Sequence, residues 1–415
     1  MYPTGDFSRF AHSIGVCHVA GRVLEALIAS KQLDVDDRKL QLFRLAALLH
    51  DIGHYPFSHA FEEAVDNFYK KTLFGDGEVK KSFNHERAGK EILSVDPQLT
   101  EILGEEGYSP TEVAAIFMHE SADPLANLIS SELDADRIDY LLRMSHSTGL
   151  PYGSVDIDYL VSELCLDNEK RLCVSNKGLR TAEHLLLSRY FANQQIAFHK
   201  TVVAVEQVLA DVVGALLEAE LLDCSAEWVS QSIQSGDWHG FTDDYVLSLL
   251  PELQRRTTDE VLLSKIRALL ERRLPKLIVE RSFIHSEGSQ NDKQRLARER
   301  KELEGVASRL ATESGLDPRF WFVRSMQGSP VSAFGANISI AALRELEDSG
   351  ALSQGIRVRK RDGSSEALVS SEESILSIVG GSSLCSAKLY FLAPPAWNSQ
   401  KYADEVKAMR ASAGS

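Results

Sequence analysis

Six of the twelve histidines lie within the first 85 residues, and the densest segment is HDIGHYPFSH, from His50 to His59. His50 and Asp51 end an apolar stretch, FRLAALL, that is typical of a buried helix, and Gly53 follows where a helix would stop. A helix end can direct two neighbouring side chains at one point, and the loop after it can return His54 and His59 to the same cleft. Imidazole nitrogens combined with carboxylate oxygens suit Zn, Fe, Mn or Ni better than Mg or Ca. This segment therefore predicts part of a transition-metal site.

A complete metal site needs ligands from other parts of the chain, and two segments offer them. RFAHSIG places His12 at the start of the first helical segment. LDADRIDYLLR places Asp134, Asp136 and Asp139 at the start of another, where Asp136 and Asp139 are i,i+3 neighbours on one face. Any one histidine alone is more typical of a structural residue, and acidic residues at a helix start also complement the helix dipole. The joint occurrence of these segments is what indicates a metal centre.

The elements that must position these residues are mainly helices. Apolar residues at helical spacing predict helices at 16–28, 40–49, 57–68, 86–93, 110–118 and 134–143, and one long helix or two successive ones within 176–222. After about residue 275, β-branched and aromatic segments predict strands at 276–283, 320–324, 355–359 and 387–392, with helices at 294–312, 374–379 and 403–411. We therefore expect a mainly α fold. A helical domain would cover 1–275, with the catalytic motifs within 9–200, and a smaller α+β domain would cover 276–415.

Charge and composition limit the classes of partner. The 415 residues carry 45 Lys and Arg against 60 Asp and Glu, a formal net charge of −15, with an ordinary globular content of hydrophobic residues. Such acidity disfavours non-specific DNA and anionic membranes, but it does not oppose a small anion held in a local pocket. Five scattered cysteines without a CxxC pair suit reduced thiols, and neither a signal peptide nor a bilayer-length apolar run is apparent. We expect a cytoplasmic protein without a membrane partner.

The motifs taken together resemble a known family. The order of His12, then His50-Asp51, then Asp136 is the H…HD…D signature of the HD-domain metal-dependent phosphohydrolases. Within that superfamily, RFAHSIGV, LLHDIGHYPFSHAFE, FNHERAG and SSELDADRIDYLLR are similar to the deoxynucleoside triphosphate triphosphohydrolase (dNTPase) branch. The match is dense from about residue 2 to residue 200. A later piece, IRVRKRDGSSEALVSSEESIL, loosely resembles the small C-terminal domain of the bacterial members.

The resemblance implies a role for each of three sets of residues. The implied metal ligands are His12, His50, Asp51 and Asp136. The implied catalytic set is His54, His59, Glu62 and His85, in which His59 is the general acid and Glu62 orients it. The implied substrate-binding residues, near the phosphates or the sugar, are Arg9, Arg137, Tyr140, Arg189, His199 and Lys200. The implied cofactor is a divalent or trivalent ion of Mn, Fe, Zn or Ni, and a bound nucleotide can bring Mg²⁺ as well.

The implied reaction is hydrolysis of a dNTP to a deoxynucleoside and inorganic triphosphate, by attack of a metal-activated hydroxide on the α-phosphorus. The resemblance also implies a homo-oligomer. Met144 stands where the family usually has an aspartate that reads the sugar 3′-hydroxyl, and Ala197 stands where the vertebrate member has a tyrosine. Sugar and base preference therefore stay open. Two alternatives also stay open: an HD-type phosphodiesterase or nuclease acting on another nucleotide or on single-stranded nucleic acid, and a catalytically vestigial nucleotide-binding regulatory protein. The acidic charge disfavours the nucleic-acid partner.

Overall fold

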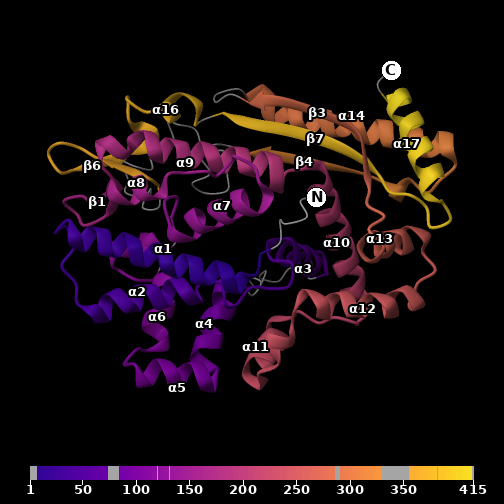
Figure 1. Ribbon diagram of the computed structural model, residues 1–415. Coiled ribbons are helices and arrows are strands. Elements are labelled where there is room, and N and C mark those ends of the chain that lie inside the picture. The colour runs from indigo at the N-terminus through magenta and orange to yellow at the C-terminus, as the bar shows by residue number, and fades with distance from the viewer. Residues whose placement is uncertain are drawn as a thin grey trace.

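Helices form most of this protein, which we describe from a computed structural model covering residues 7–72, 84–118, 120–129, 131–285, 290–328, 355–380 and 382–413. The first helices are α1 (Arg9–Ala29), α2 (Asp37–Leu49), α3 (His59–Thr72), α4 (His85–Val95), α5 (Pro97–Glu105), α6 (Pro110–Phe117) and α7 (Ala135–Thr148). They are followed by α8 (Ile157–Ser162), α9 (Leu179–Ala192), a π-helical turn (Asn193–Ala197), α10 (Lys200–Glu218), α11 (Ala226–Ser235), α12 (Asp243–Arg256) and α13 (Glu260–Leu270). The predicted mainly α fold is confirmed (Figure 1).

Strands are concentrated in the last third of the chain, as the sequence predicts. This part contains β3 (Lys276–His285), α14 (Gln290–Ser314), β4 (Trp321–Gly328), β5 (Arg357–Arg359), β6 (Ser365–Ala367), α16 (Leu376–Val379), β7 (Ser383–Phe391) and α17 (Ser399–Ala413). β7 is the central strand of an antiparallel sheet with the order β3-β7-β4. Ala387, Leu389 and Phe391 of β7 are buried in a hydrophobic cluster that also includes residues of α10 and α14. The smaller α+β portion thus shares a core with the helical portion.

A second, small sheet returns the C-terminal part of the chain to the helical core. Its order is β1-β2-β5-β6, in which β1 (Leu164–Leu166) and β2 (Leu172–Val174) are short strands that follow α8. β2 pairs in parallel with β5 at Val174 and Val358. Ile356, Val358 and Leu376 are buried in the same hydrophobic cluster as α1 and α7. The division at residue 275 remains a prediction, and any division must keep residues 355–380 with the helices on which they pack.

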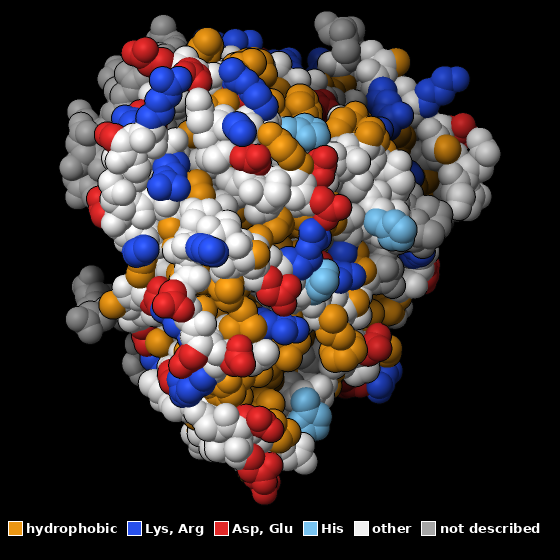
Figure 2. Space-filling model, turned by 60° about the vertical axis from the view of Figure 1, so that its left-hand side comes forward, with side chains coloured by type: hydrophobic (Ala, Val, Ile, Leu, Met, Phe, Trp, Pro, Cys, Tyr) orange, Lys and Arg blue, Asp and Glu red, His pale blue; other side chains and the backbone are white. Residues whose placement is uncertain are grey.

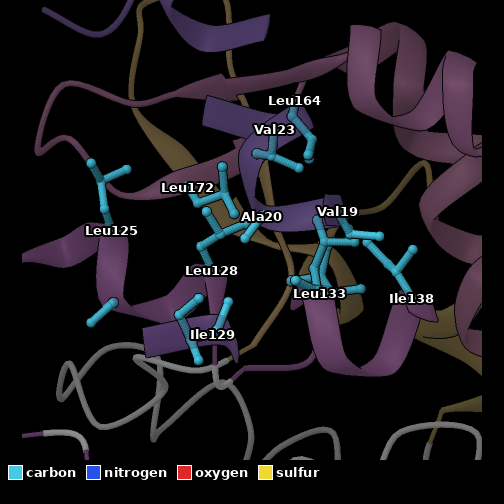
Figure 3. Close-up of a cluster of buried hydrophobic side chains, with 14 of the residues drawn as sticks. Val19, Ala20, Val23, Leu125, Leu128, Ile129, Leu133, Ile138, Leu164 and Leu172 are labelled. Carbon is cyan, nitrogen blue, oxygen red and sulfur yellow. The ribbon is translucent and has the colours of Figure 1, made fainter. Parts of the chain in front are cut away.

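The helices that carry the metal-site motifs pack closely on one another. α1 buries Val16, Val19, Ala20 and Val23 in one hydrophobic cluster with residues of α2 and α7. Figure 3 shows the last three of them beside residues of α7, of the segment before α7 and of the small sheet. Gly15 permits the contact between α1 and α7, because a Cβ there would lie 1.8 Å from Asp139 Oδ1. Ser8 caps α1 through its hydroxyl, so that helix begins at Arg9, earlier than the apolar periodicity indicates. This packing brings the start of α1 to the start of α7.

The distribution of charged side chains on the surface is consistent with the net negative charge of the sequence. On the face drawn in Figure 2, acidic and basic side chains alternate with hydrophobic ones, and the coloured basic side chains there do not merge into one extended basic surface. Among the described residues, no helix is long and apolar enough to cross a bilayer.

The docking of residues 374–379 on α9 depends on a buried carboxylate. Glu183 Oε1 accepts hydrogen bonds from the Ser374 hydroxyl at 2.8 Å and the Ile375 N–H at 2.7 Å. Replacing Glu183 by alanine is expected to cost about 1–3 kcal/mol of unfolding free energy, because two donors lose their acceptor. Urea denaturation measures this cost. Arg180→Ala is the matched control: this side chain is 68% exposed and bonds the same carboxylate from the solvent side, so its loss should change stability much less than the loss of Glu183.

Candidate metal centre

The predicted metal ligands meet where α1 and α7 begin and α2 ends. His12 Nε2 lies 2.9 Å from Asp136 Oδ1 and 3.9 Å from Asp51 Oδ2. His50 Nε2 lies 3.2 Å from Asp51 Oδ1. His12, His50 and Asp51 each offer a ligand atom within 4.8 Å of the others. Three separate helices thus contribute to one group of side chains that could hold a metal ion.

The state of His50 fits a bound cation. Its Nδ1 lies 2.9 Å from the Ala47 carbonyl oxygen, so Nδ1 carries the proton and Nε2 presents a lone pair. That Nε2 is buried and has no hydrogen-bond donor among the described residues, yet it faces a carboxylate oxygen of Asp51. Two electron-rich atoms facing each other in a buried place are what a metal ion between them would stabilise. A mixed imidazole and carboxylate set suits a transition metal.

Electrostatics at this group depend on the neighbouring carboxylates. Burial lowers the pKa of His12, but hydrogen bonds to Asp136 and Asp139 and the charge of Asp51 raise it to about 9. Burial likewise raises the pKa of Asp51, but the hydrogen bond from His54 and the electrostatic effect of the neighbouring imidazoles and the Arg9 guanidinium outweigh it, and the pKa lies well below its ordinary range. Asp51 is therefore a carboxylate at any ordinary pH, and His12 holds a proton when no ion replaces it.

A second cluster of titratable side chains adjoins the first. Glu62 Oε2 lies 3.2 Å from His59 Nδ1, and its Oε1 lies 3.0 Å from His85 Nδ1. Burial raises the pKa of Glu62, but the hydrogen bonds and charges of the two histidines bring it far below its usual value. Burial lowers the pKa of His85, and Glu62 more than compensates, so the net direction is upward. His54 stacks on His85 with ring centroids 4.1 Å apart.

The turn before α3 positions this cluster through unusual backbone. Phe57 and Ser58 both have positive φ, 52° and 60°, which side chains other than glycine rarely adopt. The Phe57 N–H donates to Asp243 Oδ1 of α12 at 2.8 Å, which holds the turn in place. Gly53 is also required, because a Cβ there would lie 2.2 Å from the carbonyl oxygen of His85. Strained backbone of this kind concentrates at functional sites.

One cavity of about 560 Å³ joins the two clusters. Its lining includes His12, His50, Asp51, Asp136, His54, His59, His85, Arg9, Tyr140 and Met144. Glu62 stands behind His59 and His85. Arg9 enters this cavity paired with Asp51 at 3.1 Å and in contact with the Ser58 hydroxyl. Nearly all of the predicted metal and catalytic residues are therefore brought together, along with two of the predicted substrate-binding ones.

Four predicted substrate-binding residues lie outside the lining of this cavity. Arg137 pairs with Asp134 at 3.3 Å, and Arg189 is buried 3.7 Å from Glu132, where its charge acts on Tyr140. His199 caps α10, since its Nδ1 accepts from the Thr201 N–H. Lys200 lines a separate cavity of about 660 Å³, together with residues 271–277 at the start of β3 and residues of α17. Their roles toward a substrate stay predictions.

Asp139, which the sequence offers with Asp134 and Asp136 as a possible ligand, has no role among those that the family resemblance implies. Its Oδ2 accepts the His12 Nδ1 proton at 2.7 Å and also the Arg143 Nε proton at 2.5 Å. This carboxylate fixes the ring so that Nε2 faces Asp136, as outer carboxylates do for histidines that bind metals. The signal for it in the sequence is its position three residues after Asp136 on the same helix face.

Replacing Asp139 by asparagine is expected to weaken metal binding by about 10–100-fold, because the ring of His12 loses its charged acceptor and its fixed tautomer. Competition with a chelator of known affinity measures the change. Arg143→Gln, which keeps the hydrogen bond between Asp139 and His12, should weaken metal binding less. Equal metal affinities for Asp139→Asn and the wild type would contradict the assignment.

Metal affinity should also depend on pH through His12. Its pKa of about 9 means that an entering ion must displace a proton below that pH. Affinity is therefore expected to rise by up to about tenfold per pH unit as pH approaches 9 and then to level off.

The stability of the metal-free protein should depend on pH in the opposite direction. The proton on His12 stabilises the fold fully below pH 6.5, and its contribution is lost as pH rises through about 9. Chelator competition and thermal melting across this range measure both slopes. A pH-independent affinity would contradict the prediction.

Comparison with known proteins bears on the same residues. Residues 9–144, which include every predicted metal ligand, match the family model of the HD domain. Residues 155–361 match the model of the HD associated region. The chain belongs to the HD-domain phosphohydrolase superfamily. The predicted family is thereby confirmed, and the ligand signature lies inside the matched HD domain.

Individual relatives of this HD-domain protein cover part of its length. It is 30% identical over 212 residues to Uncharacterized protein YwfO of Bacillus subtilis, and the aligned region covers 50% of this chain and 44% of YwfO. It is 30% identical over 226 residues to the Deoxynucleoside triphosphate triphosphohydrolase SAMHD1 homolog of Dictyostelium discoideum, covering 51% and 40%. The human SAMHD1 enzyme of the same description is 24% identical, covering 53% and 38%. The chain thus spans less than half the length of these relatives.

Solved structures match over nearly the whole chain. A phosphohydrolase from Bacteroides thetaiotaomicron superposes with a TM-score of 0.67 at 20% identity, covering 95% of this chain and 89% of that one. A hypothetical protein from Aquifex aeolicus gives 0.65 at 21% identity, covering 98% and 88%. At these identities the likeness shows the fold of the HD-domain protein alone.

Proposed function

We propose that the protein is a metal-dependent nucleotide phosphohydrolase that cleaves a dNTP into a deoxynucleoside and inorganic triphosphate. The observation that carries the proposal is one cavity that holds both the ligand group of His12, His50, Asp51 and Asp136 and the ring of His59, backed by Glu62. Relatives described as dNTP triphosphohydrolases support the choice of substrate.

The four ligand residues would hold the ion at the floor of the cavity. A transition metal there supplies Lewis-acid activation of water and of a phosphate oxygen. Arg9 contributes a guanidinium beside Asp51, where it can bind phosphate oxygens in a bidentate manner. The buried Asp51 keeps Arg9 at the cavity wall when substrate is absent.

His59 is positioned to supply the proton that the leaving oxygen needs. Its side chain is 73% exposed, and its Nδ1 is engaged by Glu62, so Nε2 carries the transferable proton. As the oxygen of water bonds to the α-phosphorus, the bond from phosphorus to the 5′-oxygen breaks and that oxygen takes the proton. Glu62 is a positioning residue in this scheme, since it acts through His59.

Met144 favours a second candidate function. Its thioether lines the cavity beside Tyr140, where the family pattern has a carboxylate, and a thioether is a weak hydrogen-bond acceptor. A site without that acceptor holds the sugar 3′-hydroxyl, and with it the substrate pose of the family, less firmly. The alternative is therefore an HD-type phosphodiesterase that acts on another nucleotide.

Product analysis tests the proposal. The protein is incubated with each dNTP and NTP in the presence of Mn²⁺, and the products are separated by chromatography. A nucleoside and inorganic triphosphate are the expected products, whereas a nucleoside monophosphate with pyrophosphate would overturn the position of the cleaved bond. Nucleotide binding in a thermal-shift assay, with no bound metal by elemental analysis and no hydrolysis, would favour the vestigial nucleotide-binding regulatory protein instead.

A further inference from the structure

The cluster behind the proposed proton donor has the composition of a metal site of its own. His54, His59, Glu62 and His85 each offer a ligand atom, and these atoms lie within 4.8 Å of one another. Three imidazoles and one carboxylate are a common set for zinc and other borderline metals. None of these four is a ligand in the group formed by His12, His50 and Asp51. The cluster is therefore a second, separate candidate.

His54 presents a nitrogen that nothing in the described structure satisfies. Its Nε2 lies 3.2 Å from Asp51 Oδ1 and hydrogen-bonds that carboxylate, so Nε2 carries the proton and Nδ1 has a bare lone pair. The side chain is only 6% exposed, and Nδ1 is buried with no hydrogen-bond partner among the described residues. A buried lone pair of this kind has lost its solvation, and a cation would restore a partner to it.

The ring positions are close to those around a tetrahedral ion. Metal–nitrogen bonds of about 2.0–2.1 Å at tetrahedral angles put imidazole centroids roughly 5 Å apart. His59 is 5.1 Å from His54 and 5.2 Å from His85, and both pairs are edge-on at 67° and 65°. The stacked pair of His54 and His85, at 4.1 Å, must open by about 1 Å to share an ion. Glu62 already contacts His59 and His85 at 3.2 and 3.0 Å, the spacing of ligands that share one metal.

We propose that His54, His59, Glu62 and His85 bind a second divalent ion of the zinc class, and that this ion inhibits the enzyme. The inhibition rests on the proposed function. An ion between Glu62 and the three rings occupies the nitrogen of His59 that Glu62 otherwise holds, so the imidazole can no longer be oriented and protonated as a general acid. The ion at the first site activates the reaction, and the ion at the second one stops it.

Metal stoichiometry tests the site without any reference to activity. The full chain is dialysed against several equivalents of Zn²⁺, and protein-bound metal is measured by elemental analysis. The wild type is expected to hold two ions per chain, whereas Glu62→Gln and His85→Ala hold one. His12→Ala also holds one, because it keeps only the second site. His184→Ala, at an exposed histidine on α9, keeps two and serves as the matched control. Thermal melting confirms that each variant is folded.

Activity then tests the consequence. Hydrolysis is expected to rise with the first equivalent of Zn²⁺ and to fall with the second. A wild type that saturates at one ion, or variants of Glu62 and His85 that both still hold two, would overturn the second site while leaving the proposed function untouched. Two bound ions with no hydrolysis of any nucleotide at any metal level would leave the site in place and refute the inhibition together with the proposed function.

Discussion

Replacing His12 by alanine is expected to remove metal binding at the first site and to reduce nucleotide hydrolysis by more than the roughly 100-fold typical of an outer carboxylate partner. His12 is the residue that α1 contributes to the ligand group, and its Nε2 faces Asp136 while its Nδ1 donates to Asp139. Without the ring, Asp136 and Asp51 are two carboxylates with no imidazole between them. The remaining set of His50 and two acids resembles the oxygen-rich sites that hold transition metals less tightly.

The fold is expected to survive this change. Asp139, which loses its imidazole partner, keeps the Arg143 guanidinium at 2.5 Å and is therefore not left as a lone buried charge. His18→Ala is the matched control, since that residue is exposed on the same helix six positions later. Metal content by elemental analysis, turnover by chromatography and the midpoint of thermal unfolding separate the three effects. Full turnover in folded His12→Ala that holds no ion at the first site would refute the ligand assignment.

Short-range rules place the candidate ligands approximately, and the resemblance to the family selects Asp136 among the three acidic residues at the start of its helix. His50-Asp51 directly follows an apolar helix, and Asp136 lies in the first turn of a capped helix, so the approximate position of each side chain follows from helical periodicity. The contact that completes the site does not follow from such rules. The approach of α1 to α7 depends on Gly15, whose missing side chain leaves room for Asp139. A lone glycine inside a helical pattern does not indicate which helix approaches it, or whether any does.

The positions of His199 and Lys200 relative to the cavity do not follow from the sequence. Both residues follow a long periodic segment, in which the helix changes to a π-helical turn, Asn193–Ala197, and restarts at Lys200. A π turn inserts an extra residue, so side chains beyond it point away from the face that a regular helix would give. Of the small sheet only the strand at 355–359 is predicted, because β1 and β2 have three residues each and the pairing of β2 with β5 joins Val174 to Val358, far apart in the sequence.

The second large effect is expected at His59. Its alanine variant should lose about 10²–10⁴-fold in turnover of a natural nucleotide, the usual contribution of a positioned general acid. Metal content at the first site should be unchanged, because His59 is not among the ligands of His12, His50 and Asp51. Glu62→Gln should lose less, since the ring remains and only its orientation and charge stabilisation weaken. The pKa of Glu62 lies well below its usual range through its contacts with His59 and His85, which is why the carboxylate is charged during turnover.

A change of leaving group separates proton donation from a general loss of structure. A 5′-nucleotide alcohol is a poor leaving group and requires a proton, whereas a nitrophenolate leaves as a stable anion. If His59 is the general acid, His59→Ala should therefore be impaired much less on a nitrophenyl phosphodiester than on a dNTP, while His12→Ala should be equally impaired on both. An equal loss on both substrates would assign His59 to binding or folding, and the proton would then have to come from His85, which shares the same carboxylate.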